Sequence, residues 1–101
     1  MIEPMWIGWI EFDVLLGDVH SLKEKRSLVR PIVAELQRKY DVSAAEAGHL
    51  DLHRRALVGV AVVAADAKHC IEVPEACERL VVSHPEVDVL SARQRIYGED
   101  D

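Results

Sequence analysis

The sequence has few aromatic residues, few cysteines and no excess of positive charge. Five of its 101 residues are aromatic while half are hydrophobic, so a core must be built mainly from Val, Leu, Ile and Ala. The formal net charge is −6, whereas generic polyanion binders usually carry a basic excess over the whole domain. The composition therefore excludes a wholly basic nucleic-acid-binding domain and leaves room only for a local basic surface.

Long apolar runs and a secretory leader are also missing. No apolar run approaches the roughly 18 residues that a membrane span needs, and the N-terminus lacks the basic region and cleavage site of a secretory signal. Cys70 and Cys77 are the only cysteines, and on one helix they would lie about 10 Å apart, too far for a disulfide. We therefore expect a cytoplasmic protein with reduced thiols and no membrane-embedded part.

Catalytic and cofactor signatures are absent from the sequence. It contains no Gly-x-Ser-x-Gly motif, no phosphate-cradling Gly-rich loop and no Met-x-Cys-x-x-Cys metal-chaperone loop. Acylphosphatase chemistry relies on an Asn, and this chain has none. We expect no enzyme and no cofactor. One alternative is a polar site built from two carboxylates and two arginines: Glu11, Asp13, Arg93 and Arg95. Cross-strand ion pairs are the simpler explanation of these four residues.

Residues 6–16 have the pattern of a first strand. The segment is largely apolar, and Glu11 and Asp13 both lie at odd positions. Because alternate residues of a strand face opposite sides, the even positions are predicted to face the core and the odd positions an open side. That open side then also carries Ile7 and Trp9.

A helix is predicted to follow this strand. Ser21 and Glu24 form a capping box for a helix that starts near Leu22. Pro31 lies inside the helical stripe, where it removes a backbone donor, so we expect a bend in the preceding turn or a late helix start. Lys25 falls among the apolar positions, which also indicates an irregular first turn.

The second half of the chain completes a β-α-β-β-α-β order. Residues 42–48 form a short strand pattern, and 57–65 are a nearly continuous apolar run that suits a central strand buried on both faces. Asp66 is a candidate N-cap of a second helix, and 87–97 form the last strand. This order predicts one α+β domain over residues 1–101 with a ferredoxin-like fold. Its four-stranded antiparallel sheet has strands 1 and 3 in the centre and both helices on one face.

A distinctive run, His-Ser-Leu-Lys-Glu-Lys-Arg-Ser, occupies residues 20–27 after a Gly-Asp turn. Further characteristic pieces are Ala45-Glu46, His49-x-Asp51, the apolar run 56–63 and the pair His69-Cys70. Together they resemble the YlxP-like family of small bacterial proteins of unknown function, over nearly the whole chain. The resemblance implies a ferredoxin-like fold and, through the family's usual gene neighbours, a place near translation initiation and ribosome maturation. The sequence departs from the family pattern at Leu50 and His53.

The predicted first helix is locally basic. It carries six basic and two acidic residues, a local charge of +4 in a chain of net −6. Lys23, Arg26 and Arg30 lie three and four residues apart on one face, the geometry needed to follow phosphates. We expect these three residues, with Arg54 and Arg55, to form a nucleic-acid-binding surface, and a merely solvated helix face is the alternative. Candidate partners are ribosomal RNA and ribosome-assembly proteins.

The open side of the sheet supports a second hypothesis. Ile7 and Trp9 would share it with small apolar residues of the third strand, and a bare apolar patch of that kind is usually covered. We therefore expect a homo-oligomer with Ile7 and Trp9 at the interface. The leading hypothesis is a non-enzymatic, RNA-associated or ribosome-associated binding module, and the alternative is a homo-oligomeric protein-interaction module.

Two groups of potential metal ligands have simpler explanations. His49, Asp51 and His53 alternate in one connection and could converge if it is extended, but no fourth ligand lies near them in the sequence. Cys70 and Cys77 fall on the apolar stripe of the second helix, where a free thiol behaves as a small hydrophobic group. We expect no stoichiometric metal.

Overall fold

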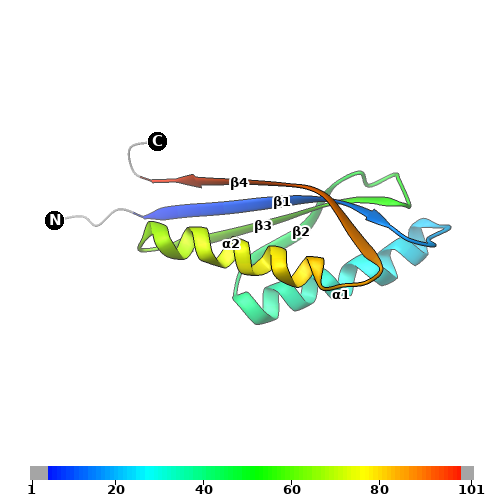
Figure 1. Cartoon of the computed structure of the whole chain (residues 1–101), viewed down its shortest axis with the longest axis horizontal. Coiled ribbons are helices and arrows are strands. Elements are labelled where there is room, and N and C mark those ends of the chain that lie inside the picture. The colour runs from blue at the N-terminus through cyan, green and yellow to red at the C-terminus, as the bar shows by residue number, and fades with distance from the viewer. Residues whose placement is uncertain (1–4, 99–101) are drawn as a thin grey trace.

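Six elements follow one another in the order β-α-β-β-α-β (Figure 1). The computed structural model describes residues 5–98. The elements are β1 (Trp6–Leu16), α1 (Leu22–Tyr40), β2 (Ser43–Gly48), β3 (Arg55–Ala64), α2 (Ala67–Val82) and β4 (Val87–Tyr97). Neighbouring strands are antiparallel in the order β2-β3-β1-β4. The predicted ferredoxin-like α+β fold, with β1 and β3 in the centre, is thereby confirmed.

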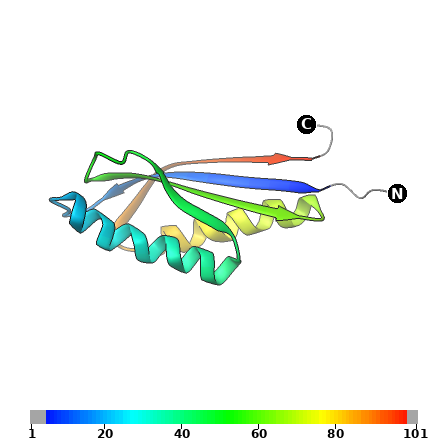
Figure 2. The same ribbon diagram turned by 180° about the vertical axis from the view of Figure 1, so that it is seen from behind.

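Both helices cover the same face of the sheet and leave the other face open (Figures 1 and 2). Even-numbered residues of β1 and β3 point toward the helices, and all of them except the half-buried Trp6 and Ala64 are buried, as the alternation of β1 predicts. The prediction that the third strand is buried on both faces is wrong. Its odd-numbered residues are half-buried and Val63 is 62% exposed, because no second layer covers them in the part of the chain that the structure describes.

The start of α1 follows from its capping residues. The Glu24 amide donates to Ser21 Oγ at 3.1 Å, and the His20 amide donates to Glu24 Oε2 at 2.9 Å. The helix begins at Leu22 and continues through Pro31. The proline therefore does not delay the start of the helix. The expected irregular first turn is also not found, because Lys25 lies on the buried stripe of a helix that begins regularly.

The second helix shields two thiols. Asp66 caps α2 by accepting from the His69 amide at 2.7 Å, as predicted. Cys70 and Cys77 are both free and lie on the buried side of this helix. Burial raises the pKa of Cys77 to about 11 and also raises that of Cys70. Within residues 5–98, neither helix is both long enough and apolar enough to cross a bilayer.

Candidate functional site

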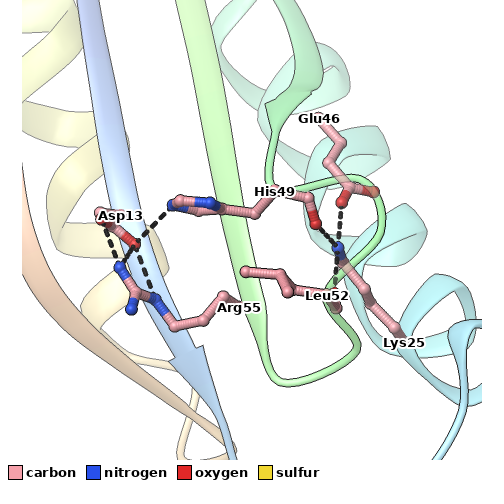
Figure 3. A network of polar contacts seen from close by, with 6 residues as sticks. All are labelled: Asp13, Lys25, Glu46, His49, Leu52 and Arg55. Atoms are coloured by element: carbon pink, nitrogen blue, oxygen red, sulfur yellow. Dashed lines mark hydrogen bonds and ion pairs between the residues drawn. The ribbon is translucent and has the colours of Figure 1, made fainter.

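A buried lysine joins α1 to the connection between β2 and β3 (Figure 3). The Lys25 side chain is 2% exposed and its Nζ pairs with Glu46 Oε2 at 2.6 Å. The same nitrogen donates to the backbone carbonyls of His49 and Leu52, both at 2.7 Å. Two of the three ammonium protons thus have carbonyl acceptors, and the Glu46 carboxylate balances the buried charge. Lys25 therefore fixes this connection against the start of α1 and is not available to an external ligand.

The ring of His49 extends this polar network to the open face of the sheet. His49 has a left-handed backbone (φ 57°), and its Nε2 lies 3.4 Å from Asp13 Oδ1. Arg55 binds the same carboxylate in a bidentate manner, with Nη2 at 2.7 Å from Oδ1 and 2.6 Å from Oδ2 (Figure 3). These hydrogen bonds hold the pKa of Asp13 below its usual value of 3.8. The Arg55 guanidinium is thus engaged inside the protein.

A second ion pair lies beside Trp9 on the open face. The register of β1 and β4 places Arg93 opposite Glu11, and the two side chains pair at 2.6 Å. The Arg93 guanidinium also lies 5.6 Å from the centre of the Trp9 ring. Arg95 lies opposite Trp9 and donates to the Gln94 carbonyl. The predicted cross-strand ion pair is therefore found for Glu11.

The exposed face of α1 carries cations of a different kind. Lys23, Arg26 and Arg30 are exposed, and together with Ser27 and Pro31 they line a shallow groove. Within residues 5–98, none of the three side chains has a hydrogen bond or an ion pair. The structure thus brings together three of the five basic residues that the sequence analysis selected.

The other two selected residues lie elsewhere. Arg54 is exposed in the connection before β3 and donates through Nε to the Leu16 carbonyl at 3.2 Å. This connection and the start of α1 occupy the same end of the molecule (Figure 2). Arg55 is on the open sheet face with Asp13, on the side away from the helices. The five basic residues therefore do not form one continuous surface.

The open sheet face also carries a shallow apolar hollow. Trp9 lines it together with small residues of the neighbouring strands: Ala45, Ala47, Gly59 and Ala61. Ile7 is 37% exposed on the same side of β1. Ile7 and Trp9 thus occupy the face that the sequence analysis assigned to them.

The potential metal ligands do not converge. The His49 ring faces Asp13, while Asp51 and His53 are exposed. Cys70 and Cys77 lie in the hydrophobic core. Among the residues that the structure describes, no three His, Cys, Asp or Glu side chains are placed to hold a metal ion.

Comparison with known proteins identifies the family. A model described as a protein of unknown function (DUF503) matches residues 7–94. The chain belongs to the DUF503 family. This DUF503 chain is also 30% identical over 82 residues to the uncharacterized protein YlxP of Bacillus subtilis (strain 168), covering 81% of this chain and 89% of YlxP. The resemblance to YlxP-like proteins is thereby confirmed.

Solved structures resemble the DUF503 chain in fold alone. The de novo designed protein Foldit4 has a TM-score of 0.50 and 14% sequence identity, over 92% of this chain and 96% of Foldit4. The apo form of LarC2, the C-terminal domain of a cyclometallase involved in the synthesis of the NPN cofactor of lactate racemase, has a TM-score of 0.49. It is 14% identical, over 93% of this chain and 56% of that chain.

The polar network around Lys25 was not predicted from the sequence. A usable signal was present, because a lysine stood among apolar helix positions and Glu46 stood in an otherwise small and apolar strand. A buried charge of this kind needs an opposite charge and further hydrogen bonds. The pair could have been inferred from that requirement, although the two backbone acceptors could not.

Proposed function

We propose that this protein is a non-enzymatic binding module that holds an RNA strand by phosphate contacts on α1, in the bacterial translation or ribosome-maturation apparatus. The observation that carries the proposal is that Lys23, Arg26 and Arg30 are exposed and have no partner within residues 5–98, although the chain has a net charge of −6. The assignment to translation rests on the resemblance to YlxP-like proteins. In this proposal the module works in the cytoplasm, where both thiols stay reduced.

Unpaired cations suit this role because no internal ion pair has to break before a phosphate binds. Their spacing of three and four residues keeps them on one helix face. The burial of Lys25 removes the neighbouring lysine from that face. In the proposal, Arg54 adds to this surface from the same end of the molecule, whereas Arg55 contributes least because Asp13 holds it. Contacts of this kind read the backbone rather than the bases.

The test is the affinity for a 12-nucleotide single-stranded RNA at low salt, measured by fluorescence anisotropy. We expect the Lys23→Ala, Arg26→Ala, Arg30→Ala variant to keep its circular dichroism spectrum and to bind at least tenfold more weakly. The matched control is Lys68→Ala, Arg93→Ala, Arg95→Ala, which removes one lysine and two arginines that have partners. Equal losses in both variants, or no loss in the first, would contradict the proposal.

A second candidate function is self-association through the open sheet face. Its support is the hollow of small residues beside Trp9 and the exposed side chains of Ile7 and Val63 on the same face. An isologous contact could place the large side chain of each copy in the hollow of the other. Trp9→Glu should then shift the mass in light scattering toward the monomer, while Val82→Glu on α2 leaves it unchanged. A parent protein that is monomeric at high concentration rules this function out.

A further inference from the structure

A cleft of about 700 Å³ opens between the C-terminal ends of α1 and α2. Its charged and polar lining comes from both helices: Glu35, Arg38, Lys39, Tyr40, Arg79 and Ser83. Three of these residues are cationic and one is acidic. The single carboxylate has a neighbour of its own, since Glu35 Oε1 lies 3.4 Å from His84 Nε2. The cleft is therefore a concentration of positive charge in an acidic chain.

The two arginines of the cleft share a property with the cations of α1. Neither Arg38 nor Arg79 has a side-chain hydrogen bond or ion pair in the described part of the chain, whereas Lys39 lies over the Tyr40 ring. The lysines and arginines of residues 5–98 whose side chains have no hydrogen bond, ion pair or ring contact are Lys23, Arg26, Arg30, Arg38 and Arg79. All of them lie on the two helices.

The C-terminal ends of the helices favour these arginines but do not occupy their donors. Basic residues are favoured in the last turn of a helix, where carbonyl groups lack partners. Some of these carbonyls have backbone partners: the Asp41 amide donates to the Gln37 carbonyl at 3.1 Å, and the Ser83 amide donates to the Arg79 carbonyl at 3.1 Å. Ser83 Oγ also donates to the Leu80 carbonyl at 2.6 Å. The guanidinium groups keep all their donors for an external acceptor.

The cleft lies in line with the basic face of α1. Arg30 and Arg38 follow Lys23 after about two and about four helical turns, so the three side chains project on the same exposed half of the helix. From Lys23 to Arg38 the helix advances about 22 Å. At 3.4 Å per nucleotide of a helical strand, this distance corresponds to about six or seven nucleotides.

We infer that the RNA strand bound by Lys23, Arg26 and Arg30 continues along α1 into this cleft, where Arg38 and Arg79 hold a further phosphate group. This inference rests on the proposed function and extends its binding surface onto α2. It gives the site a characteristic length, because a strand that keeps the stacked spacing needs about seven nucleotides to reach both ends. It also gives Arg79 a role that its position on the other helix would not otherwise imply.

The experiment compares a 4-nucleotide and a 12-nucleotide single-stranded RNA on the parent and on the Arg38→Ala, Arg79→Ala variant. The parent should bind the longer RNA more tightly, and the variant should lose about tenfold of that affinity. Its salt dependence should fall by about 1.4, for two single-strand contacts of about 0.7 each. Arg93→Ala, Arg95→Ala is the matched control, since it removes two arginines that have partners.

Three outcomes overturn the inference, and they separate it from the proposed function. If the α1 triple variant loses affinity while the Arg38→Ala, Arg79→Ala variant binds the 12-nucleotide RNA like the parent, the strand does not enter the cleft and the proposed function stands. If the parent binds neither RNA, both fail. Binding of inorganic pyrophosphate is followed by NMR. If this double variant loses pyrophosphate binding but keeps the RNA affinity of the parent, the cleft binds a small phosphorylated ligand instead.

Discussion

The open sheet face and the helix layer use their cations in opposite ways. On the sheet, Arg55 is held by Asp13, Arg93 by Glu11, and Arg95 by a backbone carbonyl. On the helices, Lys23, Arg26 and Arg30 of the α1 face and Arg38 and Arg79 of the cleft have no partner within residues 5–98. A paired arginine has already used part of its donor set. An unpaired one loses side-chain freedom and hydration when it binds a phosphate, but breaks no bond within the protein.

This difference shows why net charge is a poor guide to where an acidic protein can bind an anion. The local charge of α1 counts Lys25, but that ammonium is buried against Glu46 and contributes nothing to the surface. Arg79, which belongs to another helix, adds to the same basic region through the cleft. Anion binding depends instead on which cationic side chains lack partners once the chain has folded.

The largest effect that tests this comparison concerns two lysines on the first turns of α1. Lys25→Met leaves Glu46 without its opposite charge and two carbonyls without their donor, and we expect it to lower the free energy of unfolding by about 3 kcal/mol. The exposed Lys23 is the matched control, and Lys23→Met should change it by less than about 0.5 kcal/mol. Urea unfolding followed by circular dichroism measures both. Similar values for the two variants would show that the buried network does not hold the fold.

A smaller effect should appear in the pH dependence of stability. Arg55 lowers the folded pKa of Asp13 below the usual 3.8, so this pair stabilises the protein above that pH. The contribution is lost as the pH falls through the lowered pKa. Asp13→Asn should therefore melt at a lower temperature than the parent at neutral pH, and its melting temperature should depend less on pH below about 4. Asp88→Asn, at an exposed position of β4, is the control and should keep the parent's pH profile.

The smallest effect is expected for Arg55 in RNA binding. Because Asp13 accepts its hydrogen bonds, Arg55→Gln should change the affinity for RNA by less than about twofold. Arg26→Gln removes one charge of the same type from the unpaired set and should weaken binding several-fold. Titration of RNA with both variants measures the two affinities. A larger loss of affinity for Arg55→Gln than for Arg26→Gln would show that the paired arginine of the sheet face, and not the unpaired one of α1, binds RNA.

Local signals in the sequence were sufficient for the fold. The capping residues Ser21 and Asp66 located the starts of both helices, and the alternation in residues 6–16 identified the buried side of β1. Side-chain partners were predicted only where they lie directly across a strand pair. Arg93 faces Glu11 in this way.

Contacts that cross elements obliquely escaped prediction. Arg55 pairs in register with Leu15, so its bond to Asp13 is a diagonal contact two residues away. The cleft between Arg38 and Arg79 depends on how two helices pack, which neither helix pattern specifies. The contacts of Lys25 with the His49 and Leu52 carbonyls also depend on how the β2–β3 connection packs against α1, which no local pattern specifies.

The salt dependence of RNA binding is the most direct measure of phosphate contacts on α1. The log of the association constant for a 12-nucleotide RNA is plotted against the log of salt concentration for the parent and for the Lys23→Ala, Arg26→Ala, Arg30→Ala variant. Three single-strand phosphate contacts at about 0.7 each predict that the slope flattens by about 2 in the variant. A parent slope near zero, or the same slope in both proteins, would show that Lys23, Arg26 and Arg30 do not bind RNA phosphates.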